Sequence, residues 1–318
     1  MTELATVTSF TPPHQLKTAV LFLVFNRLNT TKQVFKAIRE AKPPRLYIAA
    51  DGAHSNKEGE AEKVQEVREY IQQHIDWECE VKTLFREQNL GCKYAVNEAI
   101  TWFFENEIEG IILEDDTLPC PSFFYYCEHY LHKFRFDKNI AAIGGTNLLS
   151  GKTKYKKDIY SLHGSIWGWA TWGDRWSEFL SFNVDSCTIK MLINYSTSFS
   201  DFINILHIYL CREKTFLNTW DYQWLMFRIV KNKLSVLPSI NQIINIGLEE
   251  GEHMKNEKIN FPAFSNLYNF DASETLERNF QYDINLWFYK NNFKKRISIL
   301  TKKIIFIIYK KIKKAIKV

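Results

Sequence analysis

The amino-acid sequence predicts an α/β fold in which helices flank a mostly parallel sheet. The first observation is a set of short, continuously apolar runs such as Thr18–Phe25, which fit strands buried on both faces. The second is that segments with apolar residues at helical spacing separate these runs. Strands that alternate with helices imply βαβ units and a mostly parallel sheet. At 318 residues the chain has room for about two domains, or for one large α/β domain with additions.

Cap and turn signals set the limits of the individual elements. Thr30 or Thr31 can cap the first helix, and Pro43-Pro44 stops it. The expected strands are Thr18–Phe25, Arg45–Ala50, Cys79–Leu84, Gly110–Leu113, Ile140–Ile143 and Leu234–Leu237. The expected helices run from Thr30 or Thr31 to about Ala41 and over 57–75, Lys93–Asn106, 122–134, 200–212 and 221–231. Residues 150–160 are Lys-rich and are expected to form a mobile loop.

The positive charge of the chain is concentrated near its C-terminal end. The net charge is +5, but residues 293–318 hold ten Lys and Arg side chains and no acid. The other residues include 31 basic and 36 acidic side chains, so the body is mildly acidic. This distribution argues against a nucleic-acid partner.

Cysteine usage and hydropathy indicate a reducing compartment. The six cysteines form no CxxC pair and are expected to be buried free thiols. Residues 1–17 contain no apolar stretch of the kind that secretory signals need. No apolar run approaches 18 residues, so we expect no membrane-spanning helix.

An acidic triplet follows one of the predicted strands. Gly110–Leu113 runs directly into Glu114-Asp115-Asp116. In an open α/β sheet, ligands bind outside the carboxyl ends of the strands. Mg²⁺ and Mn²⁺ prefer carboxylate oxygens and often share them with phosphates. We therefore predict a metal–diphosphate site, with a solvated acidic turn as the alternative.

Polar residues also follow the other three strands of the first half. These are Arg27, Asp51, and Arg86 with Asn89. Because the carboxyl ends of parallel strands share one edge, these side chains should converge on the acidic triplet. The sequence has no GxGxxG after the first strand and no GxxxxGK[ST], which disfavours dinucleotide binding and P-loop chemistry. The first turn also lacks the Gly-rich loop with a lysine that is expected of a sugar nucleotidyltransferase.

The second half contains three further candidates. Trp167–Trp176 holds four tryptophans in ten residues, which fits either a sugar-stacking platform or a packed helix start. Asp221 lies among aromatic residues, where it can act chemically or can simply begin a helix. His253 lies in an acidic loop, where a single histidine is more often structural.

Seven motifs, in the same order, resemble those of the GT-A nucleotide-sugar glycosyltransferases. The likeness is to the N-acetylglucosaminyltransferase I type and its bacterial relatives, and it covers roughly residues 18–255. The motifs are FNR at 25–27, Asp51-Gly52, Arg86 with Asn89-Leu90-Gly91, LEDD at 113–116, WGWATW at 167–172, WDYQW at 220–224 and NIGLEEGEH at 245–253. Two departures are Glu114, where relatives often have Asp, and the longer acidic stretch before His253.

The resemblance implies a role for each of these residues. The donor-binding residues would be Arg27, Asp51, Arg86, Asn89, Asn97, Glu114 and Asp115. Asp51 would bond the nucleotide base, Asp116 and His253 would bind Mn²⁺ or Mg²⁺, and Asp221 would be the general base of an inverting transfer. Trp167, Gly168 and Trp169 would contact a saccharide acceptor. The alternatives are a non-catalytic carbohydrate-binding or scaffold protein of the same fold and a metal-dependent sugar nucleotidyltransferase.

The resemblance and the charge pattern together predict the domain organisation. We expect a flexible lead-in at 1–17, a nucleotide-sugar-binding half at 18–150, an acceptor-binding half at 151–290 and a basic tail at 291–318. On a helical wheel, 293–318 places aliphatic residues opposite Lys and Arg, as in helices that lie on anionic membranes. The alternative is a helix packed on the body or on a second subunit. The expected location is the inner face of the cell membrane, and a lipid-linked acceptor in surface polysaccharide synthesis would suit it.

Overall fold

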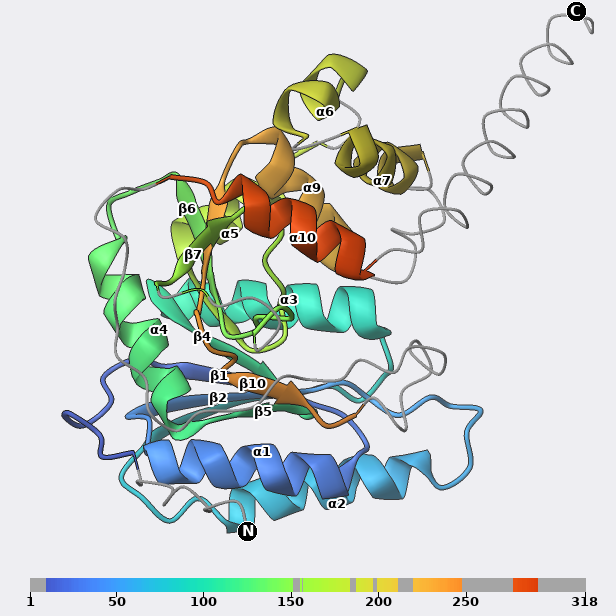
Figure 1. Ribbon diagram of the computed structural model, residues 1–318. Helices are drawn as coiled ribbons and strands as arrows, with labels where there is room; N and C mark the ends of the chain where they lie inside the picture. The colour runs from blue at the N-terminus through green and yellow to red at the C-terminus, as the bar shows by residue number, and fades with distance from the viewer. Residues whose placement is uncertain are drawn as a thin grey trace, which may run out of the picture.

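The computed structural model describes residues 10–150, 155, 157–183, 187–196, 199–210, 220–247 and 277–290. Its main sheet has eight strands in the order β3-β2-β1-β4-β8-β6-β9-β7, and β5 pairs with β10 in a second, two-stranded sheet (Figure 1). The strands are β1 (Val20–Val24), β2 (Arg45–Ala50), β3 (Glu80–Phe85), β4 (Glu109–Glu114), β5 (Thr117–Pro119), β6 (Ile140–Gly144), β7 (Ile159–Ser161), β8 (Trp169–Trp172), β9 (Leu234–Leu237) and β10 (Ile243–Asn245). The helices are α1 (Leu28–Ala41), α2 (Glu60–Gln73), α3 (Cys92–Asn106), α4 (Pro121–Lys133), α5 (Gly173–Leu180), α6 (Ile189–Tyr195), α7 (Phe199–Leu210), α9 (Asp221–Val230) and α10 (Phe280–Lys290).

The sheet is mostly parallel, as predicted. β1 pairs in parallel with both β2 and β4, and β2 pairs in parallel with β3. β8 is antiparallel to β4 and to β6, so β6 returns to the direction of the first four strands. β9 is parallel to β6, and β7 is antiparallel to β9. The carboxyl ends of β1 to β4 therefore share one edge, which lies to the right in Figure 1.

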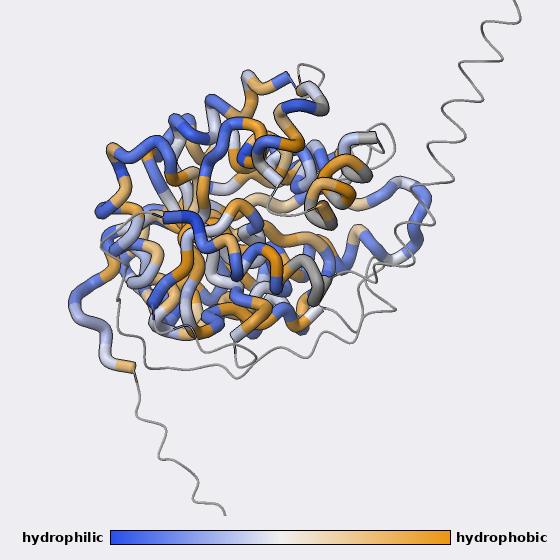
Figure 2. The backbone as a smooth tube through the Cα atoms, turned by 45° about the horizontal axis from the view of Figure 1, so that its top comes forward, coloured by the Kyte–Doolittle hydropathy of each residue, from blue (hydrophilic) through white to orange (hydrophobic). Residues whose placement is uncertain are grey.

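The core has two apolar layers, one on each face of the sheet. α1, α2 and α4 cover one face, and α3, α5 and α9 cover the other. β1 contributes to both layers, because Val20 and Phe22 point to one face while Leu21 and Leu23 point to the other. Figure 2 shows hydrophobic segments running through the interior and hydrophilic ones along the outer turns. The sheet is thus fixed from both sides, and its carboxyl edge is a rigid support for a site.

The long elements agree with the predicted ones, but several limits and short elements differ. α1 begins at Leu28, so Thr30 and Thr31 lie inside its first turn, where both hydroxyls donate to the carbonyl of Arg27. Trp169–Trp172 is not the start of a helix but the strand β8, and α5 begins only at Gly173. The sequence also did not indicate the short strands β5, β7 and β10 or the helices α6 and α10, because pairing and packing with distant segments form them.

The described part of the predicted flexible lead-in packs against α4. Leu16 is 1% exposed and belongs to the core. The Glu128 carboxylate accepts hydrogen bonds from the backbone N–H groups of Lys17 and Thr18 at 2.8 and 2.9 Å, and from the Thr18 hydroxyl at 2.8 Å. These contacts fix the entry of the chain into β1.

The cysteines do not share one environment. The five that fall among the described residues are free thiols, of which Cys120, Cys127 and Cys187 are buried as predicted, whereas Cys79 is partly buried and Cys92 is exposed. Within the described ranges, no helix combines the length and apolar character that crossing a membrane requires. The basic segment 293–318, with its predicted membrane contact, lies outside the described residues.

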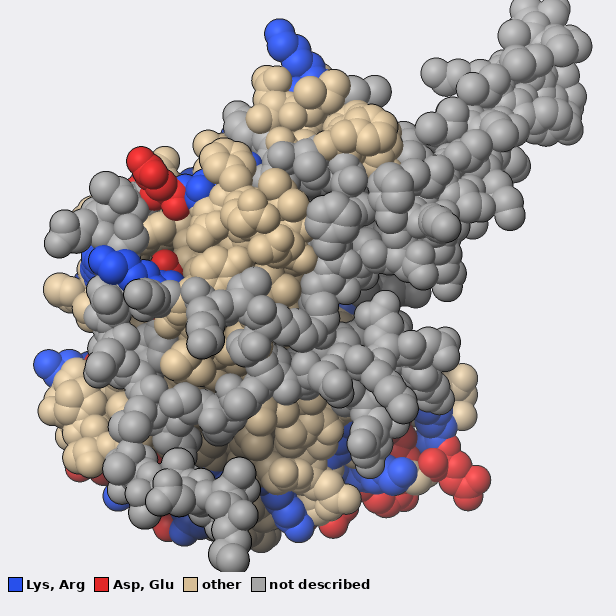
Figure 3. Space-filling view, viewed as in Figure 1, with Lys and Arg blue, Asp and Glu red and all other residues tan. Residues whose placement is uncertain are grey.

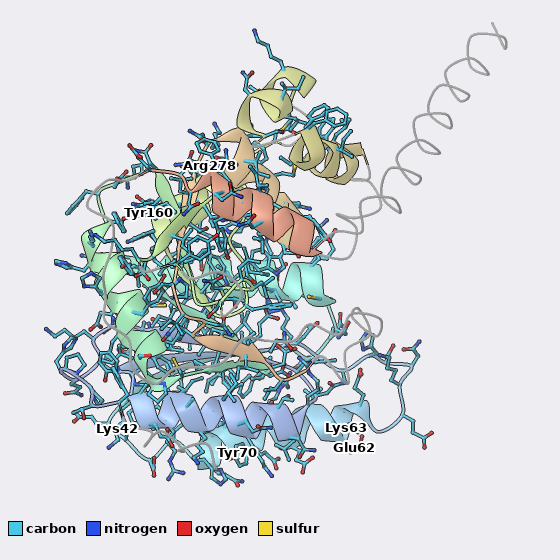
Figure 4. The ribbon with its side chains drawn as sticks, in the orientation of Figure 1. Lys42, Glu62, Lys63, Tyr70, Tyr160 and Arg278 are labelled. Carbon is cyan, nitrogen blue, oxygen red and sulfur yellow. The ribbon has the colours of Figure 1, made fainter. Side chains whose placement is uncertain are left out.

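Charged side chains of both signs lie on the outer surface of the lower helices. Figure 3 shows acidic and basic groups side by side along the lower edge. Glu62 and Lys63 of α2 are exposed and point away from the body, as Figure 4 shows. Val64, Val67 and Ile71 on the other side of the same helix are buried. This amphipathic pattern explains why α2 could be predicted from the sequence.

Candidate active site

A cavity of about 450 Å³ lies at the carboxyl ends of β1 to β4. The described residues that line it fall between Leu23 and Asp115. The polar and charged side chains that line it are Asn26, Arg27, Asp51, His54, Lys57, Glu60, Arg86, Asn89, Glu114 and Asp115. The predicted convergence of the four strand ends is thus present in the fold, and the cavity has the size of a small-molecule site.

Arg27 joins β1 to the acidic triplet. It immediately precedes α1, and its guanidinium contacts two successive carboxylates. Nη2 and Nε both donate to Asp115, the latter at 3.3 Å, and Nη1 lies 3.0 Å from Asp116 Oδ2. Asp115 is 3% exposed, so this pairing supplies the counter-charge that a buried carboxylate requires.

Burial and like charges disfavour ionisation of the remaining acid. Burial, together with Asp116 and Asp115, raises the pKa of Glu114 to about 8. Burial also raises the pKa of Asp115 to about 6, although Arg27 opposes the shift. Carboxylates this close together repel one another, and a cation placed among them would relieve the repulsion.

The acidic triplet fits a divalent cation of the kind that is held jointly with phosphates. The described residues contain no group of three or more His, Cys, Asp and Glu side chains arranged to enclose a metal. Mg²⁺, however, is usually bound by one or two carboxylates together with substrate phosphates and water. Asp116 suits that mode, because its side chain is 14% exposed and a cation bound to it would relieve the repulsion between Asp116 and Glu114. His253, the second predicted metal ligand, lies outside the described residues.

Asp51 organises the loop that follows β3. Its carboxylate accepts hydrogen bonds from the backbone N–H groups of Gly52 at 2.9 Å, Leu90 at 3.0 Å and Gly91 at 3.0 Å. Asn89 completes the link, because its Nδ2 donates to the carbonyl of Gly52 at 2.7 Å. These bonds use most of the carboxylate's acceptor sites, so a further bond from Asp51 to a base stays a prediction.

Arg68 connects the carboxyl ends of β2 and β3 through hydrogen bonds. Its Nη2 donates to the carbonyls of Ala50 at 3.3 Å, Asp51 at 3.0 Å and Arg86 at 2.7 Å. Arg68 comes from α2 and was not singled out by the sequence. Two loops of the cavity wall are therefore held in register by one guanidinium.

Two further residues, Arg86 and Asn97, were predicted to contact the donor. Arg86 pairs with a residue of α3, and Asn97 belongs to α3. Arg86 lines the cavity, and its Nη2 lies 2.7 Å from Glu98 Oε2. Asn97, on α3, is not among the lining residues, although its neighbour Val96 is. A donor contact by Asn97 therefore stays a prediction from the resemblance alone.

Asp221 reaches the same region from the second half of the chain. It is the first residue of α9, and its Oδ1 is buried without a hydrogen-bond partner among the described residues. Although Cys92 is exposed as a residue, desolvation of its thiol at the cavity wall raises its pKa, and Glu114 and Asp221 add to the shift. The Asp221 carboxylate thus acts electrostatically on two residues close to or at the cavity wall, Glu114 and Cys92.

The tryptophan motif is mainly part of the core. Trp169 is 1% exposed, and its ring stacks on Trp220 at 5.7 Å and contacts Trp176 and Trp224. A ring enclosed in this way presents no free face to a sugar. Gly168 has φ 58° and packs on Ile243 of β10, and Trp167 is partly buried. The acceptor role that we predicted for this motif rests on Trp167 and Gly168.

The sequence analysis assigned no role to four polar residues that line the cavity. These are Asn26, His54, Lys57 and Glu60. Asn26 directly precedes the predicted Arg27, and the other three lie between β2 and the first turn of α2. The polar residues that follow a predicted strand could have indicated Asn26. His54 gave no such indication, because it lies in a loop without apolar periodicity.

A larger cavity, of about 750 Å³, lies at the opposite edge of the sheet, where β1, β2 and β4 begin. Four of the charged side chains that line it are paired within the protein: Arg45 Nε lies 2.6 Å from Glu107, and Arg135 Nε 2.9 Å from Glu109. Parallel α/β sheets bind ligands at the carboxyl edge, so we assign the site to the smaller cavity.

The comparisons with known proteins found likenesses of structure but none of sequence. No protein-family model and no curated protein matches the chain. The mannosyltransferase PcManGT from Pyrobaculum calidifontis, solved with GDP-Man and Mn²⁺, aligns with 52% of this chain at 13% identity and a TM-score of 0.34. That alignment spans 47% of PcManGT, less than half of its length.

Two further solved structures align over a larger part of the chain. A UDP-glucose pyrophosphorylase complexed with UDP-glucose aligns with 74% of this chain and 95% of its own, at 11% identity and a TM-score of 0.36. The inositol-1-phosphate CTP transferase from T. maritima aligns with 70% of this chain and 86% of its own, at 10% identity and a TM-score of 0.36. Superpositions this loose do not establish a shared activity.

Proposed function

We propose that the chain is a glycosyltransferase that moves a sugar from a nucleotide-diphosphate sugar to a saccharide acceptor with inversion. The observation that carries the proposal is the single cavity in which Arg27, Glu114 and Asp115 meet the loop organised by Asp51. The seven motifs that resemble GT-A glycosyltransferases support it. The tail suggests that the acceptor is lipid-linked.

The donor would lie along the carboxyl edge of the sheet. Its nucleoside would occupy the part between the loops of Asp51 and Asn89, and its diphosphate would face Arg27 and Asp116. Arg27 is suited to phosphate because a guanidinium binds such anions through two parallel hydrogen bonds.

Asp116 would hold Mn²⁺ or Mg²⁺ together with the diphosphate oxygens. The metal would supply Lewis-acid stabilisation of the charge that develops on the leaving nucleoside diphosphate. The mutual repulsion of Glu114, Asp115 and Asp116 supports this assignment, because it makes a cation favourable there.

Asp221 would take the proton from the acceptor hydroxyl that attacks the donor sugar. An unpaired, buried carboxylate oxygen near the acidic triplet suits a general base, since nothing in the described residues competes for it. Attack from the face opposite the leaving group inverts the anomeric centre.

The test combines binding and product analysis. Nucleoside diphosphates and nucleotide sugars are screened by thermal shift with Mn²⁺, Mg²⁺ or EDTA; a ligand at 100 times its Kd adds about 2.7 kcal/mol of stability. The best donor is then incubated with the protein, and the released nucleotide is identified. A metal-dependent shift with release of nucleoside diphosphate supports the proposal.

Two other outcomes would replace it. Release of pyrophosphate from a nucleoside triphosphate and a sugar phosphate would identify a nucleotidyltransferase. No shift with any nucleotide in any metal would indicate a non-catalytic protein of this fold.

A further inference from the structure

We propose that His54 contacts the nucleoside of the donor through its Nε2 atom, and that Glu60 fixes the orientation and tautomer of this imidazole. The inference rests on the proposed function and adds a residue that the family resemblance did not supply. It stands on the contacts that link the loops after β1 and β2 at the wall of the cavity.

Glu60 is a buried carboxylate that joins these two loops. It begins α2, is 6% exposed, and accepts a hydrogen bond from Asn26 Nδ2 at 3.0 Å. The same carboxylate accepts the backbone N–H of His54 at 2.7 Å and lies 2.6 Å from His54 Nδ1. These hydrogen bonds hold the pKa of Glu60 below its ordinary value despite its burial. His54 is thus held at two atoms by one ionised group.

The contact with Glu60 determines what the other ring nitrogen can do. An ionised carboxylate accepts hydrogen bonds and cannot donate, so Nδ1 carries the hydrogen. In the neutral ring Nε2 then has a free lone pair, and it points away from Glu60. His54 lines the cavity, and no described residue hydrogen-bonds to its Nε2. The edge contact with Phe25, at 6.1 Å between ring centroids, further limits rotation of the imidazole.

The lone pair on His54 Nε2 requires a ligand group that donates a hydrogen bond. Phosphate oxygens are acceptors and match Nε2 only when the ring is protonated, whereas a hydrogen-bond donor matches the neutral ring. The nucleoside does offer donors, either a ring N–H of the base or a hydroxyl of the ribose. Position agrees with this choice, because His54 follows β2, on the Asp51 side of the cavity.

The primary test compares two identical substitutions by calorimetry with the nucleoside diphosphate that binds wild-type protein best. His54→Phe keeps an aromatic ring but removes Nε2, and it should raise the Kd about tenfold, as the loss of one ordinary hydrogen bond does. The matched control is His74→Phe. His74 Nδ1 donates to the Tyr70 carbonyl at 2.7 Å and its ring stacks on Tyr70, but His74 does not line the cavity. Figure 4 labels Tyr70, which lies along α2 from the end marked by Glu62 and Lys63.

Two deoxynucleotides, one without the 2′ and one without the 3′ hydroxyl, distinguish a ribose donor from a base donor. If a ribose hydroxyl is the partner, wild-type protein loses about tenfold in affinity for the compound that lacks it and His54→Phe loses nothing more. If the base is the partner, each deoxy substitution has the same effect on both proteins. A Kd for His54→Phe within twofold of wild type, with His74→Phe also unchanged, overturns the inference.

A spectroscopic measurement on wild-type protein covers the case in which His54→Phe does not fold. The ¹⁵N shifts of the imidazole report its tautomer, and the Nε2 signal of His54 should move when the nucleoside diphosphate saturates the protein. No movement at saturation overturns the inference. Glu60→Leu removes the carboxylate that accepts the Nδ1 hydrogen, so tautomer and ring orientation are no longer fixed, and it should weaken binding about as much as His54→Phe; unchanged affinity would contradict the role of Glu60.

The two proposals fail in different ways. Wild-type protein that binds no nucleotide contradicts the proposed function as a whole. Wild-type protein that binds a nucleotide with no contribution from His54 contradicts the present inference alone.

Discussion

At the scale of single residues, Arg27 does most to define the site, because one guanidinium contacts Asp115 and Asp116 together. Two further residues of the site, Asp51 and Glu114, lie at the carboxyl ends of β2 and β4. Each of these side chains is held by a strand rather than by a long loop. Substitutions here should therefore report on chemistry more than on folding.

Asp221→Asn should lower kcat by 10²–10⁴-fold with a smaller change in KM, because general-base catalysis contributes a factor of this size. The measurement is steady-state kinetics with donor and acceptor. Asp174→Asn is the matched control, since Asp174 is also an acid in the first turn of a helix but is exposed. A loss of less than tenfold for Asp221→Asn would exclude this residue as the base.

Asp116→Ala should abolish metal-dependent turnover, since it removes the carboxylate proposed to hold the cation. Turnover is measured across a Mn²⁺ titration. Asp76→Ala is the control, because Asp76 pairs with Arg39 on the surface and is 55% exposed. Full metal-dependent activity of Asp116→Ala would show that the metal is bound elsewhere.

Glu114 should make the apo protein less stable as the pH rises. Because its pKa is raised from 4.5 to about 8, the folded state binds more protons than the unfolded state between these values. The free energy of unfolding then falls with increasing pH across this window, by at most about 1.4 kcal/mol per pH unit for one group. Urea denaturation with a chelator present should show this slope in wild type and a shallower one in Glu114→Gln. Equal slopes would mean that Glu114 ionises normally.

At the scale of elements, the two-stranded sheet of β5 and β10 holds the end of the acidic triplet in place. The N–H of Ile246, just after β10, donates to the carbonyl of Asp116 at 2.8 Å. Gly247 then lies directly against the side chains of Asp116 and Arg27. A Cβ atom at this position would therefore displace the side chains of Asp116 and Arg27.

Gly247→Ala should reduce metal-dependent activity at least tenfold while changing the melting temperature little. Its Cβ would lie 2.5 Å from Asp116 Oδ2 and 2.7 Å from Arg27 Nη1, so mainly flexible side-chain ends must move. Gly173→Ala is the control, because a Cβ there meets its nearest atoms at 3.4 Å, an ordinary contact. A large fall in melting temperature for Gly247→Ala would instead indicate a backbone role.

The elements also show how far the sequence could be interpreted. β1, β2 and β4 were predictable because their apolar runs are continuous, and the carboxyl-edge rule then placed Arg27, Asp51 and Glu114 together. β8 was not, because four tryptophans separated by small residues fit a strand, a helix start or a surface equally well. The link from Glu60 to His54 was unpredictable for another reason, since it depends on tertiary contacts between two loops.

At the scale of the whole molecule, β8 of the second half lies between β4 and β6 of the first half, so one sheet contains strands of both halves. Asp221 approaches the acidic triplet from the second half. The proposed reaction therefore requires both halves to keep their positions on one continuous sheet.

The full-length protein should sediment with anionic liposomes, because each basic residue near such a surface contributes about 1 kcal/mol. Replacing Lys310, Lys313, Lys314 and Lys317 with Glu should abolish sedimentation without changing donor binding, which is measured by thermal shift. Neutral liposomes are the control. Unchanged sedimentation of the variant would indicate that the tail packs on protein instead.

The described residues that wall the donor cavity all come from between Leu23 and Asp115, whereas Asp221 lies more than a hundred residues further on. Under the proposed function, the segment that selects the nucleotide is therefore separate in the sequence from the segment that acts on the acceptor. A recombination joint between them would exchange one preference and leave the other intact. Relatives of this protein should accordingly vary in donor and in acceptor independently.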